Sequence, residues 1–260
     1  MIRPFTPFHA LIISCSLVIA AFIVLPLLEM ITQPSLASLR EAAQDRDVLR
    51  SIWLSVYCSG MAAIIALILG TPLAYLLARR SFTGKKFVES LVDLPIMIPH
   101  PVIGIAVLSL AGKGHIIGDA AQALGIRIMG SVTGIIVVLT YVGLPFYVNT
   151  VKVGFEAIPK RMEHVSRSLG ASPGQTFLRI TGPLAWRAMI VGMIMCTARA
   201  VSEFGAVIIV AYHPMTAPVL MYERFTAYGL AYSQPVAVWL ILVCLVLFLL
   251  LRIASRPTMQ

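Results

Sequence analysis

The chain has 260 residues, of which 59% are hydrophobic and only 12% carry a formal charge. Soluble domains have roughly 25% charged and about 45–50% apolar residues, so this chain has too few charged side chains to cover a water-soluble protein of its size. The composition excludes a soluble enzyme, a disordered tail and a disulfide-rich secreted module. It predicts an integral membrane protein, all α-helical because backbone polar groups in lipid must be satisfied within each segment.

Six stretches that are largely free of Asp, Glu, Lys and Arg are long enough to cross the ~30 Å hydrocarbon layer of a bilayer as helices. The first is too long for the apolar region of a cleaved signal peptide, and no small-x-small cleavage site follows it. We expect residues 1–50 to hold the first transmembrane helix and an extracytoplasmic loop, and residues 51–252 to form the main transmembrane domain. The predicted spans are Ala10–Leu28, Ile52–Ala78, Leu94–Gly112, Ile128–Val151, Ala188–Tyr212 and Gln234–Leu251.

The third predicted span begins with the run Leu-Pro-Ile-Met-Ile-Pro-His-Pro at residues 94–101. Its three prolines remove backbone donors, so the run cannot begin an ordinary straight helix. We expect broken or irregular backbone here, which at membrane depth must be covered by protein or line a cavity. Two interpretations stay open: a segment that lines a transport pathway, or a kinked helix start at the membrane surface.

Lys and Arg side chains are concentrated on one side of the predicted spans. The two terminal segments together with 79–93 and 152–187 hold 13 of them, whereas 29–51, 113–127 and 213–233 hold 6. Cytoplasmic loops of membrane proteins carry the excess of positive charge. We therefore expect a multi-pass protein of the cell membrane with both termini in the cytoplasm. The net charge of +9 then follows from topology, and nothing favours nucleic-acid binding.

Enzyme signatures are absent from the sequence. There is no G-x-x-x-x-G-K-[ST] nucleotide-binding motif, because Gly84-Lys85-Lys86 lacks the upstream glycine and a following Ser or Thr. The histidines are scattered, and the four cysteines lie singly in apolar runs, so we expect buried small hydrophobic cysteines and no metal, cofactor or disulfide. If the protein moves a solute uphill with ATP, a separate ATP-binding subunit must hydrolyse it.

The longest predicted cytoplasmic segment carries strong helix signals. Pro159 suits the first turn of a helix, and Gly170 is placed to end that helix in a left-handed conformation. Ser172 can cap a second helix, with Pro173 at its first position and Gln175 completing a capping box. Two capped helices predict a rigid surface that is presented to a partner in the cytoplasm.

This segment contains the run Glu163-His164-Val165-Ser166-Arg167-Ser168-Leu169-Gly170-Ala171. Nine residues separate Gly170 from Ile180, and Gly182-Pro183 follows. The spacing resembles the EAA loop of type I ABC importer permeases, in which E-A-A, three residues, G, nine residues and I-x-L-P follow one another. His164, Val165 and Ser166 occupy the E-A-A positions, and Gly182 replaces the leucine.

In that family the loop docks into a groove on the ATP-binding subunit. The resemblance implies the six-helix type I importer permease fold, with a cytoplasmic two-helix coupling loop at residues 156–187. The residues to which it assigns a part in ATPase coupling are Glu163, His164, Ser168, Gly170 and Ala171.

Further along, Arg199-Ala200-Val201-Ser202-Glu203-Phe204-Gly205-Ala206 is similar to the R-A-x-[GS]-E-F-G-A segment of sulfate, molybdate and tungstate permeases. The run 211–218, followed by Tyr222-Glu223-Arg224-Phe225, is similar to the molybdate/tungstate members, especially the archaeal type. The resemblance implies the permease subunit of an ATP-driven oxyanion importer. Its partners would be two cytoplasmic ATP-binding subunits, a second permease copy, an extracytoplasmic substrate-binding protein and the lipid bilayer.

Arg199 and Glu203 interrupt the fifth predicted span four residues apart, so they share one helix face. An unpaired charge at the bilayer centre costs at least ~2.5–3.5 kcal/mol, which favours a mutually neutralising pair that fixes helix packing. The functional alternative is that Arg199 helps to set the electrostatic potential of an oxyanion pathway.

Two rival functions remain. The first is a sulfate or thiosulfate importer of the same build. An ion-coupled secondary transporter would typically show an inverted repeat and several intramembrane carboxylates, whereas Glu203 is the only acidic residue deep in a predicted span. Sensitivity of uptake to vanadate distinguishes an ATP-driven importer from an ion-coupled carrier.

Overall fold

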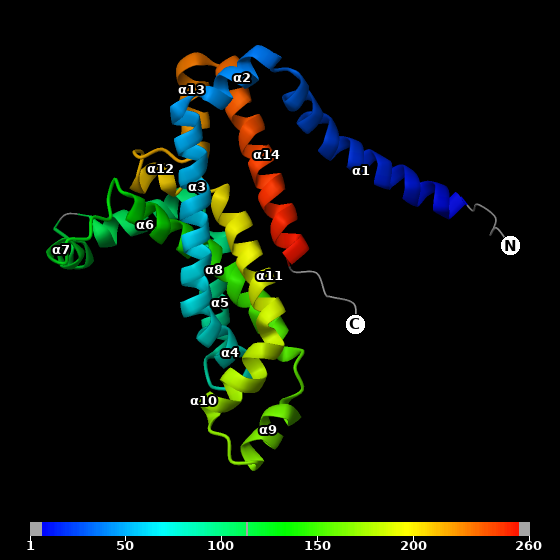
Figure 1. The fold of residues 1–260 in the computed structure, drawn as a ribbon, viewed down its shortest axis with the longest axis vertical. Coiled ribbons are helices and arrows are strands. Elements are labelled where there is room, and N and C mark those ends of the chain that lie inside the picture. Colours follow the sequence, from blue (N-terminus) through cyan, green and yellow to red (C-terminus); the bar gives the residue numbers. More distant parts are fainter. Residues whose placement is uncertain (1–6, 113, 255–260) are drawn as a thin grey trace.

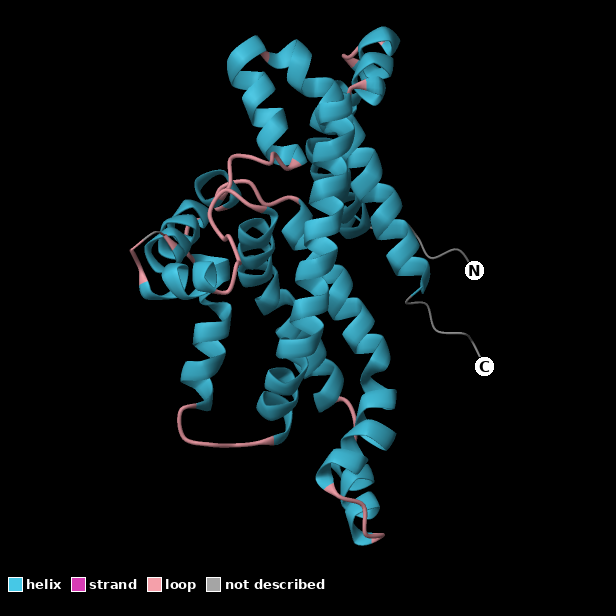
Figure 2. Cartoon of the chain, turned by 60° about the vertical axis from the view of Figure 1, so that its left-hand side comes forward, coloured by secondary structure: helices cyan, strands magenta, loops and turns pink. Residues whose placement is uncertain are grey.

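The computed structural model describes residues 7–112 and 114–254, so the terminal residues for which a cytoplasmic location is predicted lie outside the described ranges. The structure is 83% helical without strands in those ranges, and the predicted all-α fold is confirmed. Figure 2 shows the helices joined by loops. The elements, in which η1 and η2 are π-helical turns, are α1 (Pro7–Thr32), α2 (Leu36–Gln44), α3 (Arg46–Ile65), η1 (Ala66–Gly70), α4 (Thr71–Arg79), α5 (Lys85–Met97), α6 (His100–Ala111), α7 (Ile116–Ala123), α8 (Val132–Glu156), α9 (Lys160–Ser168), α10 (Pro173–Thr176), η2 (Phe177–Thr181), α11 (Gly182–Val201), α12 (Val207–Val210), α13 (Ala217–Tyr228) and α14 (Leu230–Ala254).

Within the described residues, five helices are long and apolar enough to cross a membrane, and the bent pair of α5 and α6 makes a sixth span. The direction of the chain bends by 111° between these two helices. The break that the prolines predict is present, but it lies at Ile98 and Pro99, after a complete helix of 13 residues that runs through Pro95. The predicted break therefore lies within the run 94–101, although this run does not begin the span, because α5 precedes it.

Helix α5 extends the third span toward the loop at 80–84 because its carboxylates have partners on α8. Glu89 forms an ion pair with Lys152, and Asn149 Nδ2 donates a hydrogen bond of 2.6 Å to Asp93 Oδ1. Glu89 and Asp93 are four residues apart and so lie on the same helix face. The predicted span began at Leu94 because the charged residues before it were taken as its end, whereas the helix begins at Lys85.

Two spans contain a π-helical turn just before a proline. The turn η1 precedes Pro72, and η2 precedes Pro183. At the end of η2 the N–H of Gly182 donates to the carbonyl of Phe177, five residues earlier. The wider turn accommodates a proline, which lacks an N–H and would clash with the carbonyl four residues before it. The spans thus continue unbroken over Arg46–Arg79 and Pro173–Val201.

The fifth span differs from the predicted range at both ends. It begins at Pro173, because the helix continues through Arg179 and Arg187, which are exposed on its surface. It ends at Val201, after which a turn leads into the single-turn helix α12. The second helix of the predicted coupling loop is therefore the first turn of this span and not a separate element.

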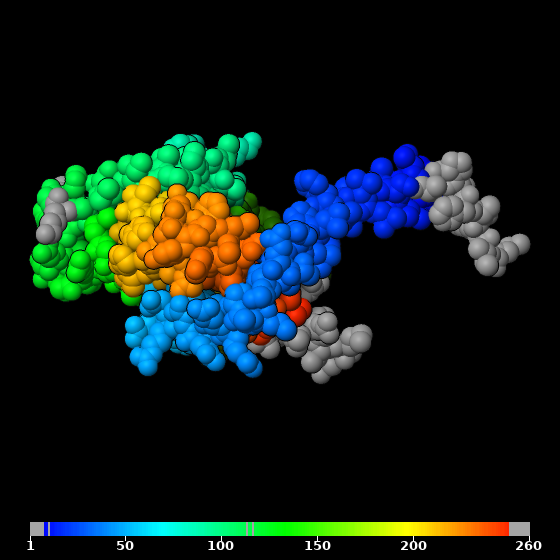
Figure 3. Space-filling model, turned by 90° about the horizontal axis from the view of Figure 1, so that it is seen from above, coloured from blue at the N-terminus to red at the C-terminus, as the bar shows by residue number. Residues whose placement is uncertain are grey.

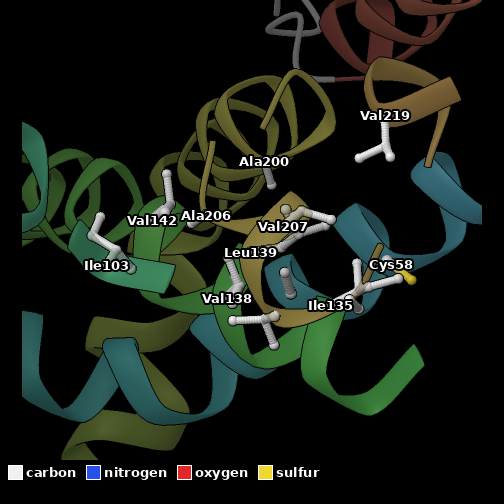
Figure 4. Close-up of a cluster of buried hydrophobic side chains, with 13 residues drawn as sticks. Cys58, Ile103, Ile135, Val138, Leu139, Val142, Ala200, Ala206, Val207 and Val219 are labelled. Atoms are coloured by element: carbon white, nitrogen blue, oxygen red, sulfur yellow. The ribbon is translucent and has the colours of Figure 1, made fainter. Parts of the chain in front are cut away.

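Helix α8 is at the centre of the packing and contributes to two hydrophobic clusters. Figure 4 shows the first, where Ile135 and Leu139 of α8 lie with Cys58 of α3. Small residues allow close approach, since a Cβ added to Gly143 would lie 2.6 Å from Cys196 Sγ. Such contacts are a usual source of helix association in membranes. Cys58 and Cys196 are buried as predicted, whereas Cys15 is exposed and Cys244 half-buried, and none of the four forms a disulfide in the described chain.

The elements are arranged along one long axis (Figure 1). Helices α2 and α13 lie at one end, whereas α9, α10 and the turn between α4 and α5 lie at the other. Helices α6 and α12 lie between these ends, to one side of α3. Helix α1 diverges from the rest of the chain, as Figures 1 and 3 show, and no residue of Leu11–Thr32 is buried.

Candidate functional site

The segment between α8 and α11 forms a stiff hairpin at one end of the molecule. Helix α9 ends before Gly170, whose φ of +88° is the left-handed conformation that only glycine adopts without strain. The predicted capping box is present: Gln175 N–H donates to Ser172 Oγ at 3.2 Å, and Ser172 N–H donates to Gln175 Oε1 at 2.9 Å. Local sequence signals therefore define the turn between α9 and α10.

Four of the five predicted coupling residues lie at the surface of this hairpin. His164, Ser168 and Gly170 are exposed, and Ala171 is half-buried. The exposed side of α9 and its following turn is partly apolar, with fractional exposures of 43%, 50% and 83% for Met162, Val165 and Leu169.

Glu163, the fifth predicted coupling residue, points into the protein and is buried. Its Oε1 accepts hydrogen bonds from Arg79 Nε at 2.7 Å and from Thr181 Oγ1 at 3.0 Å, and its Oε2 accepts one from Tyr75 Oη at 3.2 Å. Arg79 also donates from Nη2 to the carbonyl of Ile158. One carboxylate thus joins α9 to the end of α4 and to η2.

A pocket of about 220 Å³ opens beside this carboxylate, between α4 and the hairpin. Arg80, Lys160 and Arg167 line it, and their side chains form no ion pair with the described residues. Glu163 is the only acidic residue of the lining and is neutralised by Arg79. The pocket therefore carries an excess of positive charge.

A second charged site lies where the broken third span meets the end of the fifth. Arg199 Nη2 donates to Glu203 Oε2 at 2.9 Å, and the same nitrogen lies 2.6 Å from His100 Nε2. His100 Nδ1 lies 3.2 Å from Glu203 Oε2. Arg199 Nη2 also lies 3.1 Å from His100 Nδ1, so this nitrogen is close to both ring nitrogens and to the carboxylate.

The backbone brings these three side chains together. Glu203 lies beyond the end of α11, where its Oε1 accepts the N–H of Ala206 at 3.0 Å and so stabilises the turn into α12. A Cβ on Gly205 would lie 3.2 Å from His100 Cβ, and one on Gly104 would lie 2.8 Å from the carbonyl oxygen of Ala206. Two glycines therefore permit the close contact of α6 with this turn.

Sequence reasoning identified Arg199 and Glu203 but not His100. His100 is 99 residues away from Arg199 in the sequence. It begins α6, directly after the break at Pro99, and this change of direction places it beside α11. The available signal was a single titratable residue between two prolines in an otherwise apolar stretch. No group of three or more His, Cys, Asp or Glu that could hold a metal ion lies within the described part of the chain.

Comparison with known protein families adds an independent observation. Residues 70–258 match the model of the binding-protein-dependent transport system inner membrane component family. The chain belongs to this family. It is therefore a multi-pass permease of a binding-protein-dependent importer, and the resemblance stated from the sequence is confirmed.

Relatives of the permease point to one branch. It is 41% identical over 235 residues to the molybdate/tungstate transport system permease protein WtpB of Methanocaldococcus jannaschii, covering 90% of this chain and 92% of that protein. It is 40% identical to the protein of the same name from Pyrococcus furiosus, covering 90% of each chain. The sulfate transport system permease protein CysT of Synechocystis is 31% identical over 75% of this chain and 70% of its own length.

Solved structures confirm the fold of the permease. A bacterial ABC transporter that imports the acidic polysaccharide alginate superimposes with a TM-score of 0.75, covering 97% of this chain and 96% of that chain at 17% identity. The type I importer permease fold that the resemblance implied is therefore the observed fold.

Proposed function

We propose that the permease is the transmembrane subunit of an ATP-driven importer of molybdate or tungstate. The observation that carries this proposal is 41% identity, over nine-tenths of the chain, to a molybdate/tungstate permease. The sulfate alternative has weaker support, because the sulfate relative is more distant and matches less of the chain. No nucleotide-binding motif is present, so hydrolysis is assigned to a separate ATP-binding subunit.

The hairpin of α9 and α10 is the proposed docking site of that subunit. Met162, Val165 and Leu169 give it an exposed apolar surface, which is typical of a protein-binding surface. The basic pocket beside Glu163 offers charge complementarity to an acidic side chain of the partner. The stiffness of the turn at Gly170 and Ser172 would let the hairpin transmit movement.

Two permease copies and two ATP-binding subunits form the proposed transporter. Helix α1 supports this arrangement, because its 26 residues extend away from the rest of the chain and leave an apolar helix for a second copy or lipid to cover. A substrate-binding protein would contact the opposite end, including residues 212–232. Both termini and the hairpin are assigned to the cytoplasm from the distribution of Lys and Arg.

Cysteine labelling tests this orientation. After the native cysteines are replaced, single cysteines at Arg40 and Gly174 are treated with an impermeant thiol reagent in intact cells. We expect labelling at Arg40→Cys and none at Gly174→Cys. The reverse pattern contradicts the assignment.

Uptake tests the function itself. The permease is co-purified with its ATP-binding subunit, reconstituted into liposomes and supplied with the partner binding protein and labelled tungstate, molybdate or sulfate. We expect ATP-dependent uptake of tungstate and molybdate that vanadate abolishes, and preferential binding of these anions by the binding protein. Uptake that survives vanadate, or a clear preference for sulfate, would overturn the proposal.

A further inference from the structure

The site at the break of the third span contains more hydrogen-bonding capacity than its own ion pair uses. A guanidinium has five N–H donors on three nitrogens. Every contact of the Arg199 guanidinium with the described residues is made by Nη2, which serves both Glu203 and His100. The N–H groups on Nε and Nη1 therefore have no acceptor in the described part of the protein.

The three side chains differ in their access to the surroundings. Glu203 is fully buried, and both of its oxygens are bonded, one to Arg199 and His100 and the other to the backbone of Ala206. In contrast, 19% of the Arg199 side chain and 38% of the His100 side chain remain exposed. The carboxylate is thus a fixed anchor, whereas the guanidinium presents its unused donors at the surface of the chain.

This exposed surface cannot face lipid. Helices α6 and α12 lie between the two ends of the molecule, at membrane depth in the proposed arrangement (Figure 1). A cation exposed to hydrocarbon is costly, so intramembrane Arg and His side chains face protein or a water-filled cavity. Broken backbone at that depth, as at Ile98 and Pro99, obeys the same restriction. The exposed part of the site therefore faces another protein chain or a water-filled cavity.

We propose that Arg199 is a transient contact site for a tetrahedral oxyanion dianion inside the pathway, with His100 as its positioning residue. The inference rests on the proposed function. It adds a site in the permease itself that contacts the anion, separate from the binding protein that selects it. Nε and Nη1 of Arg199 donate to the dianion, while His100 and Glu203 hold Nη2 in place. The charge of Glu203 offsets that of Arg199 and keeps the contact weak. Conduction requires such a balance, because a bound ion must also leave.

Paired conservative variants of the complete importer test this inference, with tungstate uptake into liposomes as the readout. Arg199→Lys keeps a positive charge beside Glu203 but removes the guanidinium N–H groups. We expect uptake to fall about tenfold or more, as for the loss of one charge-assisted hydrogen bond. Arg50→Lys is the control, because Arg50 is exposed on α3 and lies outside both this site and the coupling loop, and it should import at the parental rate. Co-purification of the ATP-binding subunit should be unchanged in both.

The positioning role of His100 has its own test. His100→Gln retains a side-chain acceptor for Arg199 Nη2, whereas His100→Phe retains a ring without one. We expect His100→Phe to lose uptake about tenfold and His100→Gln to recover most of it. Parental uptake by Arg199→Lys, or equal defects in the two His100 variants, would overturn the inference.

Water access provides a readout that does not depend on uptake. Ser202 is exposed, and its hydroxyl donates to the carbonyl of Arg199, so Ser202→Cys samples the same surface with a small change. In a background without native cysteines, it should react with a small anionic thiol reagent, and tungstate during turnover should slow the reaction. An unreactive cysteine in the complete transporter contradicts the inference. A parental importer that takes up no tungstate refutes the proposed function instead, so the two failures are distinguishable.

Discussion

The hairpin and the intramembrane break each contain a buried glutamate bonded to an arginine, but the two arginines are used differently. Arg79 is almost fully enclosed, with 6% of its side chain exposed, and it binds both Glu163 and the carbonyl of Ile158. Arg199 is 19% exposed and engages its protein partners through one nitrogen. The enclosed pair is a structural joint, whereas the partly open pair retains N–H groups without an acceptor in the described residues. The same pair of residue types therefore serves two purposes, depending on what surrounds the guanidinium.

The largest effect should follow from opening the enclosed pair. Arg79→Ala leaves the carboxylate of Glu163 buried without its cation, which costs about 3–5 kcal/mol and releases α9 from α4. We expect a lower melting temperature of the purified permease and poor recovery of the ATP-binding subunit. Arg80→Ala removes an exposed neighbouring charge and should leave the melting temperature close to that of the parent. Equal stability of the two variants would show that the joint contributes little.

A slightly smaller loss should follow at the open pair. Arg199→Ala also strands a buried carboxylate and should destabilise assembly, although water and His100 can compensate in part. The double change Arg199→Gln with Glu203→Gln should restore assembly better than either single change. We expect that restored variant to dimerise and bind the ATP-binding subunit while importing little tungstate. Single variants as stable as the parent, measured by thermal unfolding, would remove the pairing interpretation.

Gly170→Val tests the stiffness of the hairpin independently of its ion pair. An added Cβ meets no atom within 4 Å, so the expected defect arises from the φ of +88°, at about 1–2 kcal/mol. The variant should insert and dimerise but recover the ATP-binding subunit poorly or lose ATP-dependent uptake. Gly174→Val is the matched control, since that position is equally open and has no positive φ. Normal uptake and normal subunit recovery in Gly170→Val would falsify the docking role of the hairpin.

Ser172→Ala should have a milder effect on the same element. It removes one half of the capping box, and loss of such a cap costs about 1 kcal/mol. We expect a small decrease in melting temperature and nearly parental uptake. A loss as severe as that of Gly170→Val would mean that the serine contacts the partner subunit directly.

The smallest effect concerns a third pair, Arg224 with Asp45, at the opposite end of the molecule. Burial raises the pKa of Asp45, but the hydrogen bond and charge of Arg224, together with backbone hydrogen bonds from Asp47 and Val48, outweigh it, so the pKa lies below its ordinary value. The pair therefore stabilises the protein above about pH 4 and loses this contribution as the pH falls through the lowered pKa. Because both side chains are partly exposed, Asp45→Asn should cost less than about 1 kcal/mol. Its melting temperature should differ from the parent at pH 7 and converge with it in acid.

Local signals predicted much of this structure. The turn at Gly170 and the capping box at Ser172 depend on residues within a few positions of each other, and both are present. The predicted pairing of Arg199 with Glu203 is present, but the predicted shared helix face is not, because α11 ends at Val201 and Glu203 lies beyond it. In contrast, Glu163 is bonded to Arg79, 84 residues away, and to Thr181, 18 residues away. Only tertiary packing brings these residues together.

The errors in the predicted spans share one physical cause. Charged residues were taken as ends of spans, yet Glu89 is paired across α5 and α8, and Arg179 is exposed on a continuous helix. At the other end, the apolar run after Val201 was read as helix, although Glu203 bonds to the backbone of Ala206 and bends the chain. Hydropathy reports composition and cannot report which polar groups find partners.

The unbroken helix from Pro173 to Val201 has a mechanical consequence. It places the first turn of the hairpin and Arg199 on a single rod, so both ends must move together. With a rise of ~1.5 Å per residue, the two lie about 40 Å apart, and a tilt of about 5° about one end displaces the other by roughly 3 Å. That displacement is comparable to the length of the hydrogen bonds that hold the guanidinium. A tilt of this one helix would therefore shift the Arg199 guanidinium, and with it any hydrogen bonds to a bound anion, without a rearrangement of the side chains between the two sites.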